Sequence, residues 1–137
     1  ALLLSVRMPG QDFLEGGLSF EDTAILAQTL EKHGVHLLNV SSGIGGWRRP
    51  RDRAGQGYLV PEATHIQNAV KIPVIGVGGI EDGKFVDELL AQGKLSLAAI
   101  GRAILTDPSK WGRIHLSGPA RRYGDVSRGT HSALVSV

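Results

Sequence analysis

The fold is decided by residues 72–103, which read IPVIGVGGIEDGKFVDELLAQGKLSLAAIGRA. Two short apolar runs, residues 74–77 and 97–100, have the length and composition of buried strands. Between them, residues 84–92 are expected to form a helix, and Gly93 supplies the left-handed stop that ends it. A strand, a helix and a second strand in this order predict two parallel strands joined by a right-handed crossover.

The same alternation continues toward the N-terminus. Residues 2–6 and 37–40 are predicted strands, and residues 20–33 and 61–70 are predicted helices. Ser19 and Asp22 form a carboxylate variant of the capping box before the first helix, and Gly34 supplies its stop. Pro61 suits the first turn of the next helix, because its missing N–H needs no partner there. The chain therefore contains four βα units.

Four βα units place the chain in the α/β class and predict the C-terminal half of a TIM (β/α)8 barrel. An open sheet of four parallel strands would expose its inner face and both edges. We therefore expect residues 1–116 to be a half-barrel, completed by a preceding N-terminal half or by another copy in a homo-oligomer. Residues 117–137 lose the periodicity and are expected to be an irregular or poorly ordered tail.

Composition and charge narrow the class of protein. Hydrophobic residues make up 42% of the sequence and charged residues 20%, which is typical of a globular domain. The net charge of +2 is too small to predict nucleic-acid binding. The apolar start has no basic leader and breaks at Arg7, which disfavours a secretory signal or a membrane span. The chain has no cysteine, hence no thiolate metal site, and we expect a cytoplasmic protein without a metal.

Two glycine-bearing turns carry the strongest functional signal. Gly78 and Gly79 follow the third predicted strand, and Gly101 and Arg102 follow the fourth. Glycine lets the backbone approach an anion closely, and the carboxyl ends of parallel strands lie at one edge of the sheet. In (β/α)8 barrels a phosphate site commonly follows strands seven and eight, so the pair predicts a phosphate site. The alternative is an ordinary tight turn beside a solvated arginine.

The ends of the four predicted strands also resemble a known family. They read Ser5-Val6-Arg7, Val40-Ser41-Ser42-Gly43, Gly76-Val77-Gly78-Gly79-Ile80 and Ile100-Gly101-Arg102-Ala103-Ile104-Leu105-Thr106-Asp107-Pro108. In order and spacing they are similar to the C-terminal half of the old yellow enzyme family, the NAD(P)H:flavin oxidoreductases and ene-reductases. The resemblance implies FMN as cofactor, NADH or NADPH as electron donor, and a small-molecule acceptor such as an activated alkene.

The resemblance also assigns roles to residues. It implies that Arg7 lies against the polar edge of the flavin ring, where a guanidinium favours negative charge on the reduced ring. A salt bridge across the end of the sheet is the alternative for Arg7. Gly78, Gly79, Gly101 and Arg102 are the residues expected to hold the FMN phosphate.

No catalytic residue is expected in this half. In the family, the side chains that bind the substrate and the tyrosine that donates a proton come from the preceding half of the barrel. The five histidines fall on predicted helices, at the start of a strand or in the tail; they are His33, His36, His65, His115 and His131. None of them stands in a loop where the active site is expected.

A long loop over residues 43–57 is rich in arginine and is expected to be solvated and mobile. The alternative is that it contacts substrate, the phosphates of the nicotinamide dinucleotide or a neighbouring subunit; its candidate residues are Trp47, Arg48, Arg49, Arg51 and Arg53. Two other functions stay open. One is a flavin-free (β/α)8 enzyme acting on a phosphorylated metabolite, because similar glycine turns bind sugar phosphates. The other is a non-catalytic half-barrel that assembles with itself or with another chain, since its inner sheet face would be exposed.

Overall fold

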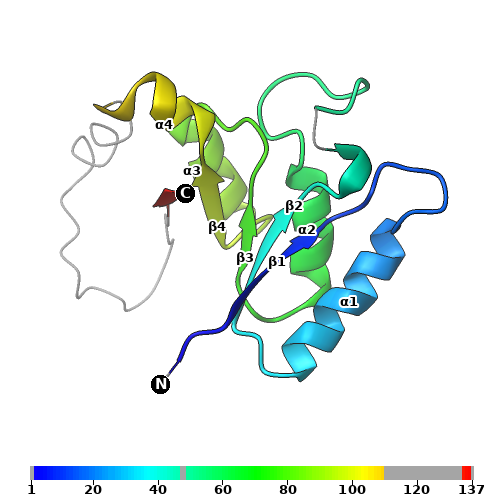
Figure 1. The fold of residues 1–137 in the computed structure, drawn as a ribbon. Coiled ribbons are helices and arrows are strands. Elements are labelled where there is room, and N and C mark those ends of the chain that lie inside the picture. The colour runs from blue at the N-terminus through cyan, green and yellow to red at the C-terminus, as the bar shows by residue number, and fades with distance from the viewer. Residues whose placement is uncertain (1, 47–48, 110–133, 137) are drawn as a thin grey trace.

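The computed structural model describes residues 2–46, 49–109 and 134–136 (Figure 1). Strands and helices alternate along the chain. They are β1 (Ser5–Pro9), α1 (Phe20–Lys32), β2 (Leu37–Ser41), the 3-10 turn η1 (Ile44–Gly46), α2 (Val60–Ala69), β3 (Val74–Gly76), α3 (Gly83–Ala91), β4 (Leu97–Ile100), α4 (Arg102–Thr106) and β5 (Leu134–Ser136). The predicted α/β class is confirmed, and a strand is found near each of the four predicted places. The first strand was placed wrongly at residues 2–6: it begins at Ser5 and ends at Pro9, because Ser5 to Pro9 are the residues in register with β2.

The strands form one sheet in the order in which they occur in the sequence. Each neighbouring pair from β1 to β5 is parallel. Arg7 lies opposite Asn39, Asn39 opposite Ile75, and Ile75 opposite Leu97. These four side chains therefore share one face of the sheet, because residues in register point to the same side.

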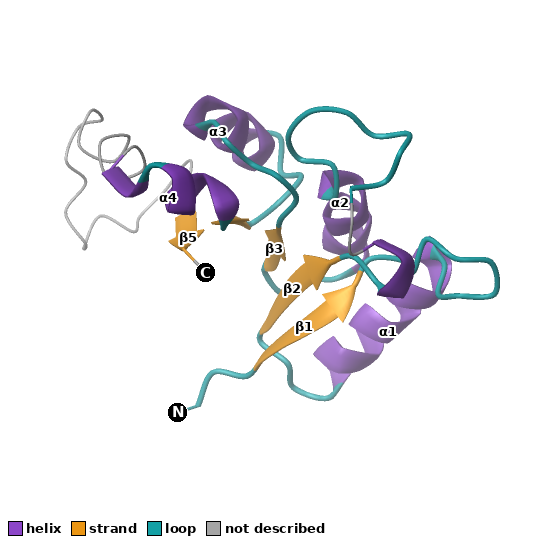
Figure 2. Cartoon of the chain, turned by 45° about the horizontal axis from the view of Figure 1, so that its top comes forward, coloured by secondary structure: helices purple, strands orange, loops and turns teal. Residues whose placement is uncertain are grey.

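The helices α1, α2 and α3 cover the other face (Figures 1 and 2). The main hydrophobic core lies between these helices and the sheet face that they cover. Its members include Met8, Leu38, Val40 and Val74 from the strands and Ala27, Ala63, Ile66 and Leu89 from the helices. The face without helices carries polar side chains on β1 and β2 and apolar ones, Ile75 and Leu97, on β3 and β4. Arg7 is exposed there, and the buried Oδ1 atom of Asn39 has no hydrogen-bond partner in the described part of the chain.

Helix ends follow from local hydrogen bonding. Ser19 caps α1: its Oγ accepts from the Asp22 N–H at 3.2 Å, and the Asp22 carboxylate accepts from the Ser19 N–H at 2.9 Å. The Ser19 hydroxyl also donates to the Asp22 carboxylate, at 2.8 Å. The bond from the Ser19 N–H, and after it the bond from the Ser19 hydroxyl, lower the pKa of Asp22 from its ordinary value of 3.8. Gly34 follows with a φ of +87°, and Pro61 lies in the first turn of α2. The predicted caps are confirmed.

Some boundaries differ from the expected ones. β3 ends at Gly76, one residue early, because Val77 already belongs to the turn that contains Gly78 and Gly79. In the tail that was expected to be irregular, Leu134–Ser136 pair with β4 as the short strand β5, and residues 117–133 lie outside the described chain. Among the described helices, none is both long and apolar enough to cross a membrane.

Candidate functional site

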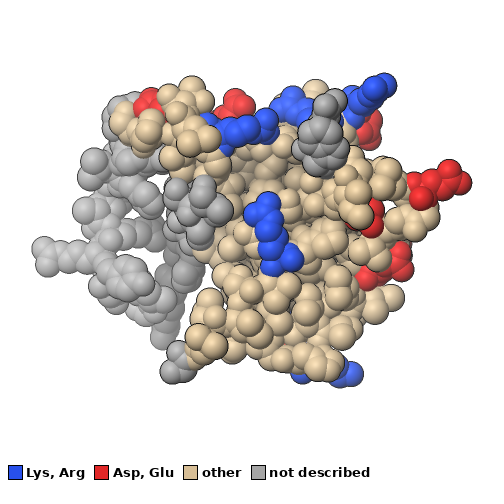
Figure 3. Space-filling view, viewed as in Figure 1, with Lys and Arg blue, Asp and Glu red and all other residues tan. Residues whose placement is uncertain are grey.

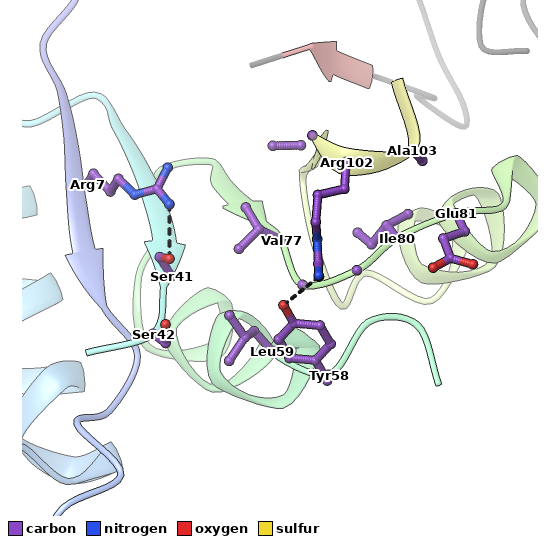
Figure 4. A pocket seen from close by; sticks show the side chains of 14 residues that line it. Arg7, Ser41, Ser42, Tyr58, Leu59, Val77, Ile80, Glu81, Arg102 and Ala103 are labelled. Carbon is purple, nitrogen blue, oxygen red and sulfur yellow. Dashed lines mark hydrogen bonds between the residues drawn. The ribbon is translucent and has the colours of Figure 1, made fainter. Parts of the chain in front are cut away.

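A cavity of about 330 Å³ opens at the carboxyl ends of the strands. Its lining comes from β1, from the turns after β2, β3 and β4, and from the residues before α2: Arg7, Ser41, Ser42, Tyr58, Leu59, Val77, Gly78, Gly79, Ile80, Glu81, Ala99, Gly101, Arg102 and Ala103. The structure thus brings together all five residues that the sequence singles out as candidates for cofactor binding. Figure 4 shows Arg7 and Arg102 on opposite sides of this space.

The turn after β3 requires glycine at two positions. Gly78 has a φ of +119° and Gly79 a φ of +63°, a region that other residues rarely adopt. A Cβ on Gly78 would lie 2.7 Å from the Leu59 nitrogen, and one on Gly79 would lie 2.7 Å from Cε1 of Tyr58. The turn therefore packs directly against the segment that precedes α2, with no room for a side chain between them.

Arg102 connects the two glycine turns. Its Nη2 donates to the Tyr58 hydroxyl at 3.0 Å and lies 3.5 Å from where a Cβ on Gly79 would stand. Arg102 follows β4 in the sequence, and its guanidinium thus reaches over the turn after β3 (Figure 4). The positive guanidinium attracts an anion, and the glycine backbone below it leaves room for one because it has no Cβ atoms.

Positive charge predominates around the cavity. Arg7 and Arg102 line it together with one acidic residue, Glu81, and Figure 4 draws the Glu81 carboxylate on the far side of Ile80 from Arg102. In Figure 1 the arrowheads of β3 and β4 point to the upper edge of the molecule, where Figure 3 shows both basic and acidic side chains. The excess of positive charge is therefore a property of the cavity lining, with two arginines against one glutamate.

Arg7 lies across the cavity from Arg102. Its Nη2 donates to the Ser41 hydroxyl at 3.0 Å, and the side chain is exposed. The recorded contact is with a neutral hydroxyl, whereas a salt bridge would need a carboxylate. With respect to the described residues, one of the five N–H groups of the guanidinium makes this bond and the others keep donors for a ligand.

The arginine-rich loop is more structured than expected. Arg53 donates from Nη1 to the Glu62 carboxylate and to the Tyr58 carbonyl, at 2.7 and 2.8 Å. Glu62 is fully buried and also accepts from Gln11 at 2.7 Å. The prediction of a solvated loop is wrong for Arg53, because the buried carboxylate on α2 needs a partner. Trp47 and Arg48 lie outside the described residues.

The histidines that the structure describes stay away from the cavity. His33 ends α1, His36 precedes β2 and accepts from the Leu4 N–H, and His65 packs edge-on against Phe20. His115 and His131 lie outside the described chain. Within the described residues, no group of three His, Asp or Glu side chains is arranged to hold a metal ion.

Tyr58 lines the cavity and was not among the candidate site residues predicted from the sequence. Tyr58 contacts the glycine turn through its ring and Arg102 through its hydroxyl, and its N–H donates to the Gly78 carbonyl at 3.1 Å. Its position just before α2 was the available signal, because the segment that links a strand to the next helix lies at the carboxyl edge of a parallel sheet.

The fold and the site define a parallel α/β protein with a cationic small-molecule cavity at the carboxyl ends of its strands. The chain belongs to the NADH:flavin oxidoreductase / NADH oxidase family, whose family model matches residues 2–117. The resemblance to the old yellow enzymes is thereby confirmed. The cofactor of the family is FMN, and its electron donors are NADH or NADPH.

Curated relatives carry matching names. The NADH oxidase of Thermoanaerobacter brockii is 38% identical over 109 residues, which are 77% of this chain and 17% of that protein. The NADPH dehydrogenase of Listeria innocua is 33% identical over 103 residues, or 75% of this chain and 30% of that protein. The metal reductase of Desulforamulus reducens is 30% identical over 108 residues, 75% of this chain and 16% of that protein. The chain thus spans less than a third of each of these relatives.

Proposed function

We propose that this chain is the C-terminal half of a (β/α)8 barrel in an FMN-dependent NAD(P)H oxidoreductase. Residues 1–116 would form the half-barrel, and a preceding N-terminal half would complete it. Sequential parallel strands with α1 to α3 all on one face support a barrel, because an open doubly wound sheet carries helices on both faces.

The uncovered sheet face supports the same proposal. Parallel strands are normally covered on both faces. Here one face carries the exposed Arg7 and the buried Oδ1 of Asn39, which has no hydrogen-bond partner among the residues that the structure describes. A second set of strands that closes the barrel would cover this face and supply partners for its polar groups. The small-molecule acceptor would then be held between the two halves.

The described residues fit the phosphate of FMN. Gly78 and Gly79 form a turn that has no Cβ atoms and is held against Tyr58, and the Arg102 guanidinium reaches over it. Gly101 has open space around the position of a Cβ, so the second turn also leaves room. We assign the phosphate to these residues. This convergence of two glycine turns and one arginine is the observation that carries the proposal.

Arg7 would lie at the polar edge of the flavin ring. Its guanidinium stands on the opposite side of the same cavity from Arg102 (Figure 4), so a cofactor that extends across the cavity would reach both. A fixed positive charge there favours the anionic form of the reduced ring. When bound, FMN supplies the hydride transfer between the nicotinamide donor and the acceptor. The residues of this half bind and orient it, and the acid and substrate-binding groups would come from the other half.

Binding of FMN to the 137-residue chain tests the proposal. A ligand at 100 times its Kd stabilises a protein by about 2.7 kcal/mol, so FMN should raise the thermal midpoint by roughly 10 °C. Ribose 5-phosphate at the same concentration serves as the comparison, because a flavin-free sugar-phosphate enzyme would prefer it. Arg102→Ala should reduce the FMN effect. Equal stabilisation by ribose 5-phosphate, or none by FMN, would overturn the proposal.

A further inference from the structure

Tyr58 holds together three parts of the cavity wall. Its ring packs against Gly79 so closely that a Cβ on that glycine would lie 2.7 Å from Cε1 of the ring. Its hydroxyl accepts a hydrogen bond from Arg102 at 3.0 Å. On the ring, the guanidinium carbon of Arg49 lies 5.1 Å from the centroid, which is the geometry of a cation–π contact. The Tyr58 side chain thus contacts the glycine turn and two arginines, Arg102 through its hydroxyl and Arg49 through its ring.

The position of Tyr58 is itself fixed by the backbone. Its N–H donates to the Gly78 carbonyl at 3.1 Å, and its own carbonyl accepts from Arg53 at 2.8 Å. Arg53 in turn is paired with the fully buried Glu62. The backbone of Tyr58 is therefore fixed by two hydrogen bonds, one to the β3 turn and one to Arg53, which pairs with Glu62 in the first turn of α2. Tyr58 itself is half-buried.

Among the described residues, Arg102 has one side-chain hydrogen bond, the one to the Tyr58 hydroxyl. It is exposed and begins the five-residue helix α4 after Gly101. A free arginine side chain samples many rotamers, and fixing one of them costs about 2 kcal/mol. A hydrogen bond that already holds the guanidinium over the glycine turn removes part of that cost before an anion binds.

We propose that Tyr58 is a positioning residue that holds the Arg102 guanidinium over the Gly78–Gly79 turn, ready for a phosphate group. The inference rests on the proposed function and goes beyond it, because it adds a residue that acts through Arg102. It predicts that the Tyr58 hydroxyl contributes to the binding of a phosphorylated ligand and contributes nothing to the binding of its dephosphorylated counterpart.

FMN and riboflavin form a matched pair of probes, since they differ by the phosphate. The full chain and its Tyr58→Phe variant are titrated with each flavin, and the Kd values are taken from the quenching of flavin fluorescence. Tyr58→Phe keeps the ring and its contacts with Gly79 and Arg49 and removes the hydroxyl alone. We expect its Kd for FMN to rise about five-fold, the effect of one hydrogen bond, and its Kd for riboflavin to stay within about two-fold.

A double-mutant cycle separates a positioning role from a direct one. If Tyr58 acts through Arg102, Tyr58→Phe causes no further loss of FMN affinity in an Arg102→Ala background. A hydroxyl that touches the phosphate itself would cause the same loss in both backgrounds. Thr29→Val is the control for hydroxyl removal, because Thr29 donates to the Ile25 carbonyl on α1, away from the cavity. Thermal midpoints without ligand show whether each variant is folded.

The outcomes test the positioning role of Tyr58 and the proposed binding of FMN separately. Selective loss of FMN affinity in Tyr58→Phe that disappears in the Arg102→Ala background supports the positioning role. Equal losses in both backgrounds, or an unchanged preference for FMN over riboflavin, overturn that role and leave the proposed function standing. If the unmodified chain binds FMN no better than riboflavin, the phosphate assignment fails and the role of Tyr58 fails with it.

Discussion

Replacing Gly79 by alanine would perturb the phosphate site at its tightest point. Gly79 has a φ of +63°, and its new Cβ would meet Cε1 of Tyr58 at 2.7 Å. A left-handed alanine costs about 1 kcal/mol, and pushing the phenol ring aside adds about 1 kcal/mol more. The ring would also move away from Arg102, which it holds by a 3.0 Å hydrogen bond. Gly79→Ala should therefore lower both stability and FMN affinity.

Gly93→Ala is a matched control for this variant. Gly93 has a φ of +67°, almost the same as Gly79, but a Cβ there would meet nothing within 4 Å. It lies after α3 and does not line the cavity. The two variants thus share the backbone strain of about 1 kcal/mol, and Gly79→Ala alone disturbs the site.

Urea unfolding without ligand and a fluorescence titration with FMN measure the two effects separately. We expect a loss of about 2 kcal/mol in the free energy of unfolding for Gly79→Ala and about 1 kcal/mol for Gly93→Ala. We expect FMN affinity to fall about ten-fold or more in Gly79→Ala and to be unchanged in Gly93→Ala. Normal FMN binding by Gly79→Ala, or an equal loss in Gly93→Ala, would refute the assignment of the turn to the phosphate.

Three other variants test separate parts of the structure. Glu62→Gln should lower the free energy of unfolding by about 2 kcal/mol in urea, because it leaves Arg53 without a charged partner beside the core. Asp22→Asn should destabilise the chain at neutral pH: the folded pKa of Asp22 lies below 3.8, so the stability it contributes is present above pH 3.8 and is lost as the pH falls through that folded pKa. Arg7→Met should make the midpoint potential of bound FMN more negative, because the guanidinium favours the reduced, anionic ring.

Each of these variants has a control in the chain. Glu88→Gln removes an exposed carboxylate on α3 and should change stability little. Glu21→Gln removes a charge from the same first turn as Asp22 without removing the capping bonds to Ser19. Arg51→Met removes an exposed arginine that does not line the cavity. An equal effect of a control and its partner variant would mean that net charge, and not the named contact, is responsible.

Much of the fold could be predicted because its signals are local. The helix expected over residues 20–33 is observed as Phe20–Lys32, since Ser19, Asp22 and Gly34 mark both of its ends by hydrogen bonding and backbone conformation. The strands β2, β3 and β4 follow from short apolar runs close to glycines, whereas β1 begins three residues later than its apolar run, residues 2–6, predicts. Convergence of the turns after β3 and β4 follows from the handedness of βαβ crossovers, which needs no knowledge of side-chain contacts.

The contacts of the long loop before α2 could not be predicted in the same way. Arg53 and Glu62 look like ordinary charged residues in the sequence, and they pair only because α2 turns Glu62 into the core beside Gln11. Tyr58 lies in a loop whose path depends on its hydrogen bonds to the β3 turn. Such long-range contacts leave no periodic pattern in the sequence, so hydrophobic periodicity cannot predict them.

A crystal structure of the chain with FMN would test the central claim most directly. The claim predicts that the phosphate lies between the Arg102 guanidinium and the Gly78–Gly79 turn, within hydrogen-bonding distance of Arg102, with the flavin ring extending toward Arg7. A phosphate bound elsewhere, for example by the exposed arginines of the loop before α2, would contradict it.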